Sequence, residues 1–572
     1  MNGTGIFIRR DEDIIFYISY IRKTNFDTSN LHMKTIALLL NFIFLFSFVN
    51  AQATGDRSLP TVKTANGLVQ GVKRSGISIY KGIPYAQAPV GDLRWREPQP
   101  VKNWDGTWKA DHFSARAMQL PIYSDMQFRS SGMSEDCLYL NIWTPAKTDS
   151  ERLPVLVYFY GGGRRAGDGS EYRYDGESMS RRGIIAVTVN YRLGVFGFLA
   201  LPELTKESSH HASGNYGFMD QTEALRWIHK NIAAFGGNPD NVTIAGESAG
   251  SSSVCAQVIS PLGRNLFAGA IGESGSVLKE EIAIPLRDAE NIGLEFSKHV
   301  GANSLKELRA MPAEQILNAT AKPAREDFPI AVDGWFFPES PVELYKAGRV
   351  AKVPAIIGWN SEEGGWKNIL GQTEPTKENY VAAVKKLYPS NADDILKLYP
   401  VNSDADVIVV ATALATDRTN AFGSWRWVEF HTKTNSPVYR YYFTRARPAL
   451  VTSSDRTSGK QAIGVEAGDP ELNGTGNFQG AVHSAEIEYA LGNLPLNRVY
   501  DWQPADYMVS AIMQDYFLNF IKTKNPNGPA LPYWPIYQSW QKDPVMVIGY
   551  DTHRAADNTR DRYLYFEKMS AK

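Results

Sequence analysis

Cysteine is nearly absent from this chain, with only Cys137 and Cys255 among 572 residues. Neither belongs to a C-x-x-C pair or to a cluster of cysteine and histidine, which excludes the usual pattern of a structural zinc site. At most one disulfide can form, so a hydrophobic core must stabilise a chain of this length. A hydrophobic content of 43% is sufficient for such a core.

An excess of charge of either sign is also missing. Lysine and arginine number 60 against 61 aspartate and glutamate residues, which gives a net charge of −1. This balance gives no electrostatic reason to expect nucleic acid or an anionic membrane surface as a partner. Repeats, long low-complexity runs and hinge-like linkers are absent after residue 51. We therefore predict a single domain over residues 52–572.

The N-terminal region carries a pattern typical of a secretory signal. An apolar run, Ile36–Val49, follows a lysine and precedes an acceptable cleavage site at Ala51. Residues 33–51 are predicted to be a signal peptide. Residues 1–32 are then an over-extended start of translation or, alternatively, part of a membrane-tethered or internally signalled precursor. Gln52 stands where a lipoprotein anchor needs a cysteine, so we expect a secreted or periplasmic protein without a membrane anchor in its mature chain.

Strand and helix patterns alternate along the rest of the chain. Runs of consecutive apolar residues predict central strands that are buried on both faces. The predicted strands are 155–159, 184–189, 241–245, 438–443 and 545–550, the predicted helices are 220–233 and 251–259, and the mainly helical stretches are 278–350 and 367–435. This order indicates the α/β class, with a large, mixed but mostly parallel central sheet, helices on both faces and helical excursions that cover the site.

The motif Gly246-Glu247-Ser248-Ala249-Gly250 connects a predicted strand to a predicted helix. Strand, G-x-S-x-G and helix together are the context of a nucleophile elbow. A serine at the tip of so sharp a turn has a strained backbone, and a side chain at either glycine would collide with the neighbouring strand and helix. The motif predicts Ser248 as a nucleophile, and the alternative is a plain glycine-rich turn.

Three glycines, Gly161 to Gly163, follow the predicted strand at 155–159 after a single residue, Tyr160. Backbone N–H groups without side chains beside them can approach a negatively charged oxygen closely. Acyl transfer needs such donors because charge develops on the carbonyl oxygen in the tetrahedral state. We predict an oxyanion hole formed by the N–H groups of Gly162, Gly163 and Ala249, and the alternative is a flexible loop.

Several longer motifs resemble those of a known family. They are Glu135–Trp143, Asn190–Gly194, Phe196–Phe198, Gly214–Gly217, Asp220-Gln221 and Asn231–Pro239. Together they are similar to the signatures of type-B carboxylesterases, the cholinesterase-like branch of the α/β-hydrolases, and resemble bacterial para-nitrobenzyl-esterase-type enzymes. The resemblance covers about residues 60–570 and implies an α/β-hydrolase fold.

The resemblance also implies the other members of a catalytic triad. A segment similar to the family's acid segment gives Glu363, with its neighbour Glu362 as the alternative, and a segment similar to the histidine segment gives His483. His483 would take the proton of Ser248 and return it to the leaving alcohol, while Glu363 fixes the imidazole tautomer. Ser248 would form an acyl-enzyme that water hydrolyses. The implied reaction uses a small-molecule ester and needs no metal or organic cofactor.

Three further positions match the family. Ser274 resembles a hydroxyl that lies near the triad in relatives, and its alternative interpretation is a simple turn serine. Arg94 and Glu135 occupy positions that form a buried ion pair in relatives. Such a pair would be structural and not catalytic.

The chain also departs from the family. Where relatives carry a C-x-Q segment this chain reads Ala117-Met118-Gln119, so Cys137 loses its partner and we expect no disulfide, with Cys255 a buried free thiol. The loop 120–133 lacks the tryptophan that binds choline in cholinesterases, which disfavours that activity because a quaternary ammonium loses its best aromatic face. Phe128 lies beside the vacated place and is a candidate substrate-binding side chain.

Arg164 and Arg165 follow the three glycines, where relatives carry an aromatic or other apolar residue. A guanidinium at Arg164 could pair with a carboxylate on the substrate. The alternative is a salt bridge from Arg164 to an acidic residue nearby in the sequence, of which the candidates are Asp168, Glu171 and Asp175.

These observations predict a serine carboxylesterase that acts on esters of short to medium acyl chains or of aromatic alcohols. An alternative is a specialised esterase for an anionic ester or for a plant, toxin or polyester-type ester. A third interpretation is a non-catalytic, cholinesterase-like adhesion or binding protein, which the retention of the nucleophile, acid, histidine and glycines disfavours.

Overall fold

Continuous apolar segments of the chain form the centre of one large sheet in the computed structural model, which describes residues 59–123, 125–279, 281–321, 327–451 and 479–570. The predicted signal peptide, the segment before it and the predicted start of the domain at residue 52 lie outside these residues. From Pro60 onward the described chain forms one compact unit. Among the described residues, no helix is both long and apolar enough to cross a membrane.

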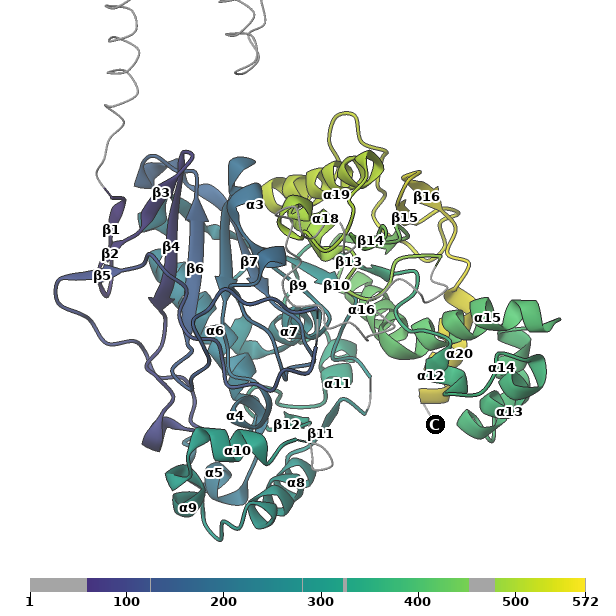
Figure 1. Cartoon of the computed structure of the whole chain (residues 1–572), viewed down its shortest axis with the longest axis horizontal. Coiled ribbons are helices and arrows are strands. Elements are labelled where there is room, and N and C mark those ends of the chain that lie inside the picture. Colours follow the sequence, from purple (N-terminus) through teal and green to yellow (C-terminus); the bar gives the residue numbers. More distant parts are fainter. Residues whose placement is uncertain (1–58, 124, 280, 322–326, 452–478, 571–572) are drawn as a thin grey trace, which may run out of the picture. The chain divides into compact units, whose positions relative to one another are not determined.

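The central sheet is mixed and mostly parallel, as predicted. Its eleven described strands lie in the order β16-β15-β14-β13-β10-β9-β7-β8-β6-β4-β3. The run from β15 to β8 is parallel, whereas β6, β4 and β3 at one end and β16 at the other pair antiparallel to their neighbours. Figure 1 shows this sheet running through the molecule.

The strands have the following bounds: β1 Thr61–Thr64, β2 Gly67–Gln70, β3 Val72–Arg74, β4 Ile77–Pro84, β5 Thr107–Lys109, β6 Tyr139–Thr144, β7 Leu153–Phe159, β8 Ile185–Val189, β9 Gly237–Glu247, β10 Gly269–Glu273, β11 Ala283–Pro285, β12 Ile330–Val332, β13 Ala355–Asn360, β14 Val438–Phe443, β15 Val545–Ile548 and β16 His553–Ala555. Strands β1, β2 and β5 form a separate small sheet, and β11 pairs with β12.

The helices have the following bounds: α3 Glu177–Arg181, α4 Gly194–Phe198, α5 Pro202–Glu207, α6 Tyr216–Asn231, α7 Ala249–Ile259, α8 Leu286–His299, α9 Leu305–Ala310, α10 Ala313–Asn318, α11 Pro341–Lys346, α12 Lys367–Leu370, α13 Lys377–Leu387, α14 Ala392–Leu398, α15 Asp404–Thr416, α16 Phe422–Thr432, α18 Ile487–Leu491, α19 Pro504–Thr523 and α20 Arg560–Ser570. The predicted helix 220–233 begins earlier, at Tyr216, and ends at Asn231.

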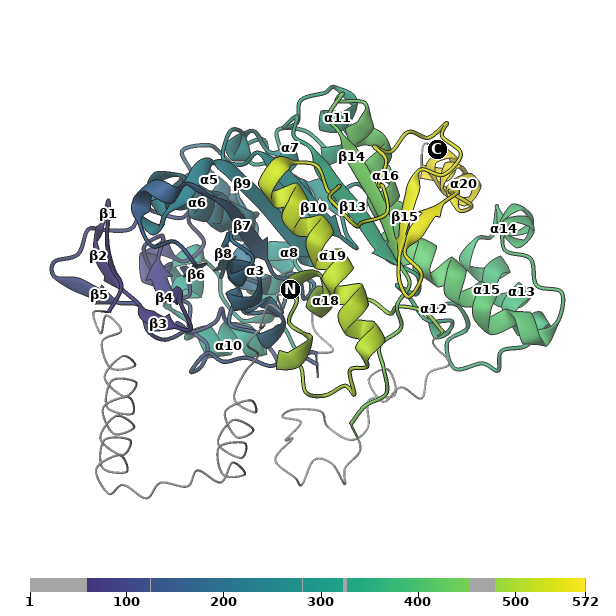
Figure 2. The same ribbon diagram turned by 90° about the horizontal axis from the view of Figure 1, so that it is seen from above.

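Helices cover both faces of the sheet, and alternate residues of β10 show which helix lies on which side. A Cβ placed on Gly272 would meet Trp427 of α16 and Ser251 of α7, whereas one on Gly269 would meet Phe520 of α19. Because strand side chains alternate between faces, α7 and α16 lie on one face and α19 on the other. Figure 2 shows the same arrangement from above.

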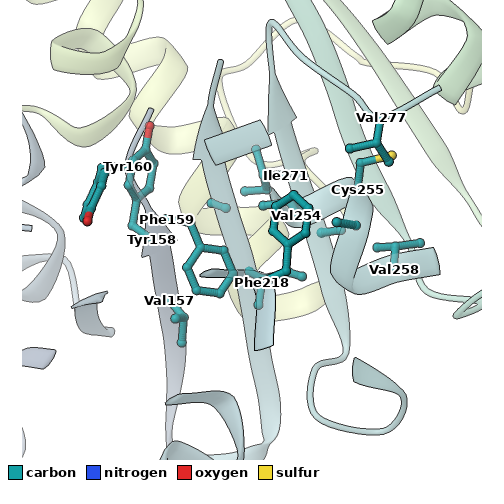
Figure 3. Close-up of a cluster of buried hydrophobic side chains, with 14 of the residues drawn as sticks. Val157, Tyr158, Phe159, Tyr160, Phe218, Val254, Cys255, Val258, Ile271 and Val277 are labelled. Carbon is teal, nitrogen blue, oxygen red and sulfur yellow. The ribbon is translucent and has the colours of Figure 1, made fainter. Parts of the chain in front are cut away.

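The core between the sheet and the helix that follows Ser248 consists of closely packed apolar side chains. Val157 and Phe159 of β7, Phe218 of α6, and Val254 of α7 are fully buried and belong to one cluster (Figure 3). Burying a side chain of this size stabilises the fold by roughly 1.5–3 kcal/mol. This packing fixes the position of α7 and therefore of the turn before it.

The two predicted helical excursions are present, but only part of the second one lies apart from the sheet. Helices α13, α14 and α15 form a group to one side in Figure 1, whereas α16 packs directly on β13 and β14. The expectation that the whole stretch 367–435 forms a cap is therefore wrong, because the apolar helix α16 is part of the layer that covers the sheet.

Candidate active site

The carboxyl ends of three parallel strands bring the predicted residues to one edge of the sheet; β7 and β9 are neighbours, and β10 lies between β9 and β13. Ser248 follows β9 directly, the three glycines follow β7, and Glu363 comes three residues after the last residue of β13. In parallel α/β sheets this edge is where ligands bind.

Ser248 occupies a strained turn, with φ of 56° and ψ of −121°. A Cβ on Gly246 would lie 2.5 Å from the carbonyl oxygen of Phe159, and one on Gly250 would lie 2.1 Å from the same oxygen. Real Cβ atoms do not approach backbone oxygen so closely, so both glycines of the motif are required. The turn points the side chain of Ser248 out of the packed layers, and it is partly exposed.

A chain of hydrogen-bond contacts joins three side chains. The Nε2 atom of His483 lies 2.9 Å from Oγ of Ser248, and its Nδ1 atom lies 2.6 Å from Oε2 of Glu363. The other oxygen of Glu363 accepts a hydrogen bond from the backbone N–H of Asn360 at 2.7 Å. This arrangement is the one that a nucleophile, a base and a carboxylate that orients the base require.

Glu362, the alternative acid, does not take part in these contacts between Ser248, His483 and Glu363. Its Oε1 atom accepts hydrogen bonds from the backbone N–H groups of Gly480 at 2.8 Å and Gln479 at 3.1 Å. Glu362 therefore holds the segment that leads to His483, and Glu363 is the carboxylate in contact with the imidazole.

Asn420 lies beside Glu363 and His483, and the sequence analysis did not identify it. Its amide group donates to Oε2 of Glu363 at 3.3 Å and also lies 3.3 Å from Nδ1 of His483. Asn420 belongs to the short π-helical turn Asp417–Ala421 between α15 and α16. A polar residue within a long helical stretch carries no local sequence signal for such a role.

A second carboxylate lies against the imidazole. The Oε1 atom of Glu247 is 3.4 Å from Nε2 of His483 and accepts a hydrogen bond from Ser484 at 2.9 Å. Burial lowers the pKa of His483, but the negative charges of Glu247 and Glu363 outweigh burial and the net shift is upward. Burial raises the pKa of Glu247 itself.

Two more buried glutamates, Glu486 and Glu273, lie close to Glu247. Oε1 of Glu486 accepts a hydrogen bond from the hydroxyl of Ser274 at 3.0 Å, so Ser274 is a buried part of this glutamate cluster. Burial and the charge of Glu247 raise the pKa of Glu486 to about 8, and burial raises the pKa of Glu273 well above its usual range. A pKa of about 8 keeps most of Glu486 protonated at neutral pH.

Two of the predicted oxyanion donors, Gly162 and Gly163, lie in a loop that only glycine can form, and the third, Ala249, begins α7. Gly162 and Gly163 have φ of 106° and 64°, and a Cβ on Gly162 would lie 2.1 Å from the carbonyl oxygen of Ala166. A Cβ on Gly161 would lie 3.1 Å from Cβ of Ser248, so the loop lies against the serine. Within the described residues, no oxygen accepts a hydrogen bond from the N–H groups of Gly162, Gly163 or Ala249.

The arginines after the glycines differ in their surroundings. Nε of Arg165 lies 3.3 Å from Asp327, and its guanidinium donates to the hydroxyl of Tyr123 at 3.4 Å. The guanidinium carbon of Arg164 lies 5.6 Å from the centre of the Phe198 ring, and its Nε is buried without a hydrogen-bond partner.

The salt bridge from Arg164 to Asp168, Glu171 or Asp175, which was the alternative interpretation, does not form. The three candidate carboxylates have other partners: Ser170 for Asp168 at 2.6 Å, Arg173 for Glu171 at 2.8 Å and Arg129 for Asp175 at 2.7 Å. That alternative is wrong because closer partners occupy these carboxylates.

The loop before residue 133 approaches the glycines through residues other than Phe128. Phe128 lies under the guanidinium of Arg116, 5.0 Å from ring centre to guanidinium carbon. Tyr123 and Met126 lie closer to the glycines: hydroxyl and methyl groups of these side chains come within 2.9 Å of Cβ positions built on Gly163 and Gly162, respectively.

The remaining sequence predictions concern structural residues. Arg94 and Glu135 form the expected buried ion pair, with Nε of Arg94 donating to Oε1 of Glu135 at 2.6 Å. Cys137 and Cys255 are both buried free thiols. Among the described residues, no group of three or more histidine, cysteine, aspartate or glutamate side chains is arranged to hold a metal ion.

Comparisons with known proteins agree on one family. The profile described as "Carboxylesterase family" matches residues 58–566. Fumonisin B1 esterase of Sphingopyxis macrogoltabida is 33% identical over 444 residues, 75% of this chain and 79% of that protein. Human cocaine esterase is 32% identical over 508 residues, 84% of each chain.

Solved structures show the same fold. Carboxylesterase Est55 of Geobacillus stearothermophilus superposes with a TM-score of 0.73 at 29% identity, over 88% of this chain and 99% of that one. A structure described as PNB esterase gives a TM-score of 0.71 at 28% identity, over 89% and 99%. The sheet and its serine turn define an α/β-hydrolase. The chain belongs to the carboxylesterase family and is a serine carboxylic-ester hydrolase, so the predicted fold class and family are confirmed.

Proposed function

We propose that Ser248, His483 and Glu363 catalyse the ester hydrolysis through an acyl-enzyme. The observation that supports this is the unbroken contact chain of 2.9 Å and 2.6 Å from Ser248 through His483 to Glu363. The proton of Ser248 moves to Nε2 of His483 while Oγ bonds to the ester carbon. The tetrahedral intermediate then breaks its bond to the alcohol, which leaves with that proton. Water attacks the acyl-enzyme in the same way, and Ser248 is restored as the acid departs.

The N–H groups of Gly162, Gly163 and Ala249 are proposed to bind the oxygen that becomes negative. They are free of acceptors among the described residues, so no protein bond has to break when the oxyanion forms. Each such donor contributes roughly 3–4 kcal/mol to the stability of the transition state. The N-terminus of α7 at Ala249 adds its positive dipole end.

An apolar cavity beside the glycine loop supports short to medium acyl chains or aromatic groups as substrates. Its volume is about 380 Å³, and its lining includes Leu120, Phe196, Leu317 and Arg165. Arg165 connects the cavity to the glycines, since its Nε lies 3.6 Å from a Cβ built on Gly163. The relatives are named for different esters, which indicates that such cavities and not the serine chemistry decide the substrate.

The proposed location is outside the cytoplasm, secreted or periplasmic, with residues 33–51 removed and no membrane anchor on the mature chain. The apolar run before Ala51 supports this proposal. N-terminal sequencing of the exported protein is expected to begin at Gln52, and a protein that retains residues 33–51 would contradict it.

Hydrolysis of a p-nitrophenyl ester panel by the wild type and two serine variants tests the proposed function. Ser248→Ala is expected to lower kcat/KM at least ~10³-fold. Ser252→Ala is the matched control, because its hydroxyl lies on the same helix but donates to the carbonyl of Ser276 at 3.2 Å; it is expected to stay within about threefold. A folded wild type without activity on any ester would favour the non-catalytic binding interpretation instead.

A further inference from the structure

Arg164 carries a charge that the described protein does not neutralise. Its Nε is buried and has no hydrogen-bond partner, and its guanidinium lies over the ring of Phe198 at 5.6 Å. Among the described residues no carboxylate lies within salt-bridge distance of it, and the three acidic side chains nearest in sequence pair elsewhere. Leaving a guanidinium partly buried and unpaired costs stability, so an ion pair within the protein does not explain why an arginine occupies this position.

The neighbouring arginine shows that an acidic partner was available. Asp327 lies 3.3 Å from Nε of Arg165, and it acts on Arg164 only as a more distant charge. Burial lowers the pKa of Arg164 and Asp327 partly opposes that shift, but an arginine remains protonated in proteins. Of the two neighbouring guanidinium groups, Arg165 forms an ion pair with Asp327, whereas Arg164 does not.

The position of Arg164 connects this charge to the reaction. Its backbone follows Gly163 directly, has φ of 60°, and accepts a hydrogen bond from the N–H of Gly194 at 2.7 Å. Gly163, the residue before Arg164, is a proposed oxyanion donor, so an acyl group whose carbonyl oxygen binds there lies next to the backbone of Arg164. The carboxylates of Glu247 and Glu363 on the other side of Ser248 would repel an anionic acyl group that had no cation to bind.

We propose that Arg164 binds a free carboxylate on the acyl part of the substrate, so that the enzyme selects half-esters of dicarboxylic acids and related anionic esters. This inference rests on the proposed function of Ser248 and the oxyanion glycines. The planar guanidinium offers two parallel N–H donors that match a carboxylate, and the ring of Phe198 supports its plane. The carboxylate lies a few bonds from the scissile carbonyl and stays beside Arg164 in the acyl-enzyme.

Three stable alkyl esters distinguish binding of a carboxylate on the acyl side, binding of one on the alcohol side, and an effect that does not depend on a carboxylate. Monoethyl glutarate carries the carboxylate on the acyl side, ethyl pentanoate is its neutral counterpart, and pentanoyloxyacetate carries the carboxylate on the alcohol side. Proton release is followed in a pH-stat for wild type, Arg164→Gln, Arg164→Lys and Arg165→Gln. The quantity compared is the ratio of kcat/KM for monoethyl glutarate to that for ethyl pentanoate.

In Arg164→Gln the ratio is expected to fall roughly 10- to 150-fold, as for a lost hydrogen-bonded charge pair. Arg164→Lys keeps the positive charge but cannot donate two parallel hydrogen bonds from one planar group, so we expect an intermediate ratio. Arg165→Gln is expected to lower the ratio less than Arg164→Gln, because Asp327 already pairs that charge.

Several results would overturn the proposal. An equal loss on both acyl esters would mean that Arg164 acts on the oxyanion or on folding. A selective effect on pentanoyloxyacetate would place the carboxylate on the alcohol side. A wild type that hydrolyses ethyl pentanoate more than tenfold faster than monoethyl glutarate would refute it without any variant. A wild type that hydrolyses neither would refute the proposed function as well, which distinguishes the two failures.

Discussion

Replacing Glu247 by glutamine is expected to move the acid limb of the pH–kcat/KM profile to lower pH. Glu247 lies 3.4 Å from Nε2 of His483, and its negative charge stabilises the imidazolium. At this separation the interaction is worth about 1 to 5 kcal/mol for effective dielectric constants of roughly 80 to 20. That range corresponds to roughly 1 to 3.5 units in the pKa of the histidine.

The lower end of this range is the expected result. Burial raises the pKa of Glu247 itself, which opposes ionisation of its carboxyl and weakens the charge that acts on His483. Without the charge, the pKa of His483 falls, and the neutral imidazole that serves as the base persists to lower pH. The inflection on the acid side should therefore move down by about one unit or more.

The assay is kcat/KM for a neutral ester between pH 4 and pH 9. Glu362→Gln is the matched control, because glutamine keeps an oxygen that can accept from Gly480 and Gln479 while Glu362 itself does not touch the imidazole. Its inflection is expected to stay within about 0.3 units of the wild type. An unchanged or higher inflection in Glu247→Gln would refute the assigned electrostatics of His483.

Two further predictions concern the frame and the cavity. Gly250→Ala places a Cβ 2.1 Å from the carbonyl oxygen of Phe159 and is expected to destabilise the fold by about 2–5 kcal/mol, seen as a lower Tm in calorimetry; an unchanged Tm would contradict the close approach. Leu317→Trp fills part of the cavity and should lower kcat/KM for p-nitrophenyl octanoate about tenfold or more relative to the acetate. A chain-length profile equal to that of the wild type would show that acyl groups bind elsewhere.

The sequence predicted the elements whose physical requirements are local. The strand before Ser248 and the glycines around it are recognisable because a buried parallel strand is continuously apolar and the turn tolerates no Cβ. The strand at 155–159 and the glycines after it are recognisable for the same reason. The short edge strands β3 and β16 have three residues each and no such signal.

The rest of the site depends on distant parts of the chain. Glu363 and His483 lie 115 and 235 residues after Ser248, and only the family resemblance pointed to them, because no local pattern marks a carboxylate that will face an imidazole. Asn420 was missed for the same reason. The alternative that gave Arg164 a salt bridge was wrong, because sequence proximity cannot show that Arg173 and Arg129 pair with two of the nearby carboxylates.

Covalent labelling shows directly whether Ser248 is the nucleophile. The wild type is treated with diethyl p-nitrophenyl phosphate, which gives a stable phosphoryl-enzyme, and intact mass and peptide mapping follow. We expect one diethylphosphoryl group per chain, attached to Ser248, with labelling strongly slowed in His483→Gln and absent in Ser248→Ala. A group attached to another residue, or a folded wild type that takes up none, would contradict the role of Ser248 as the nucleophile.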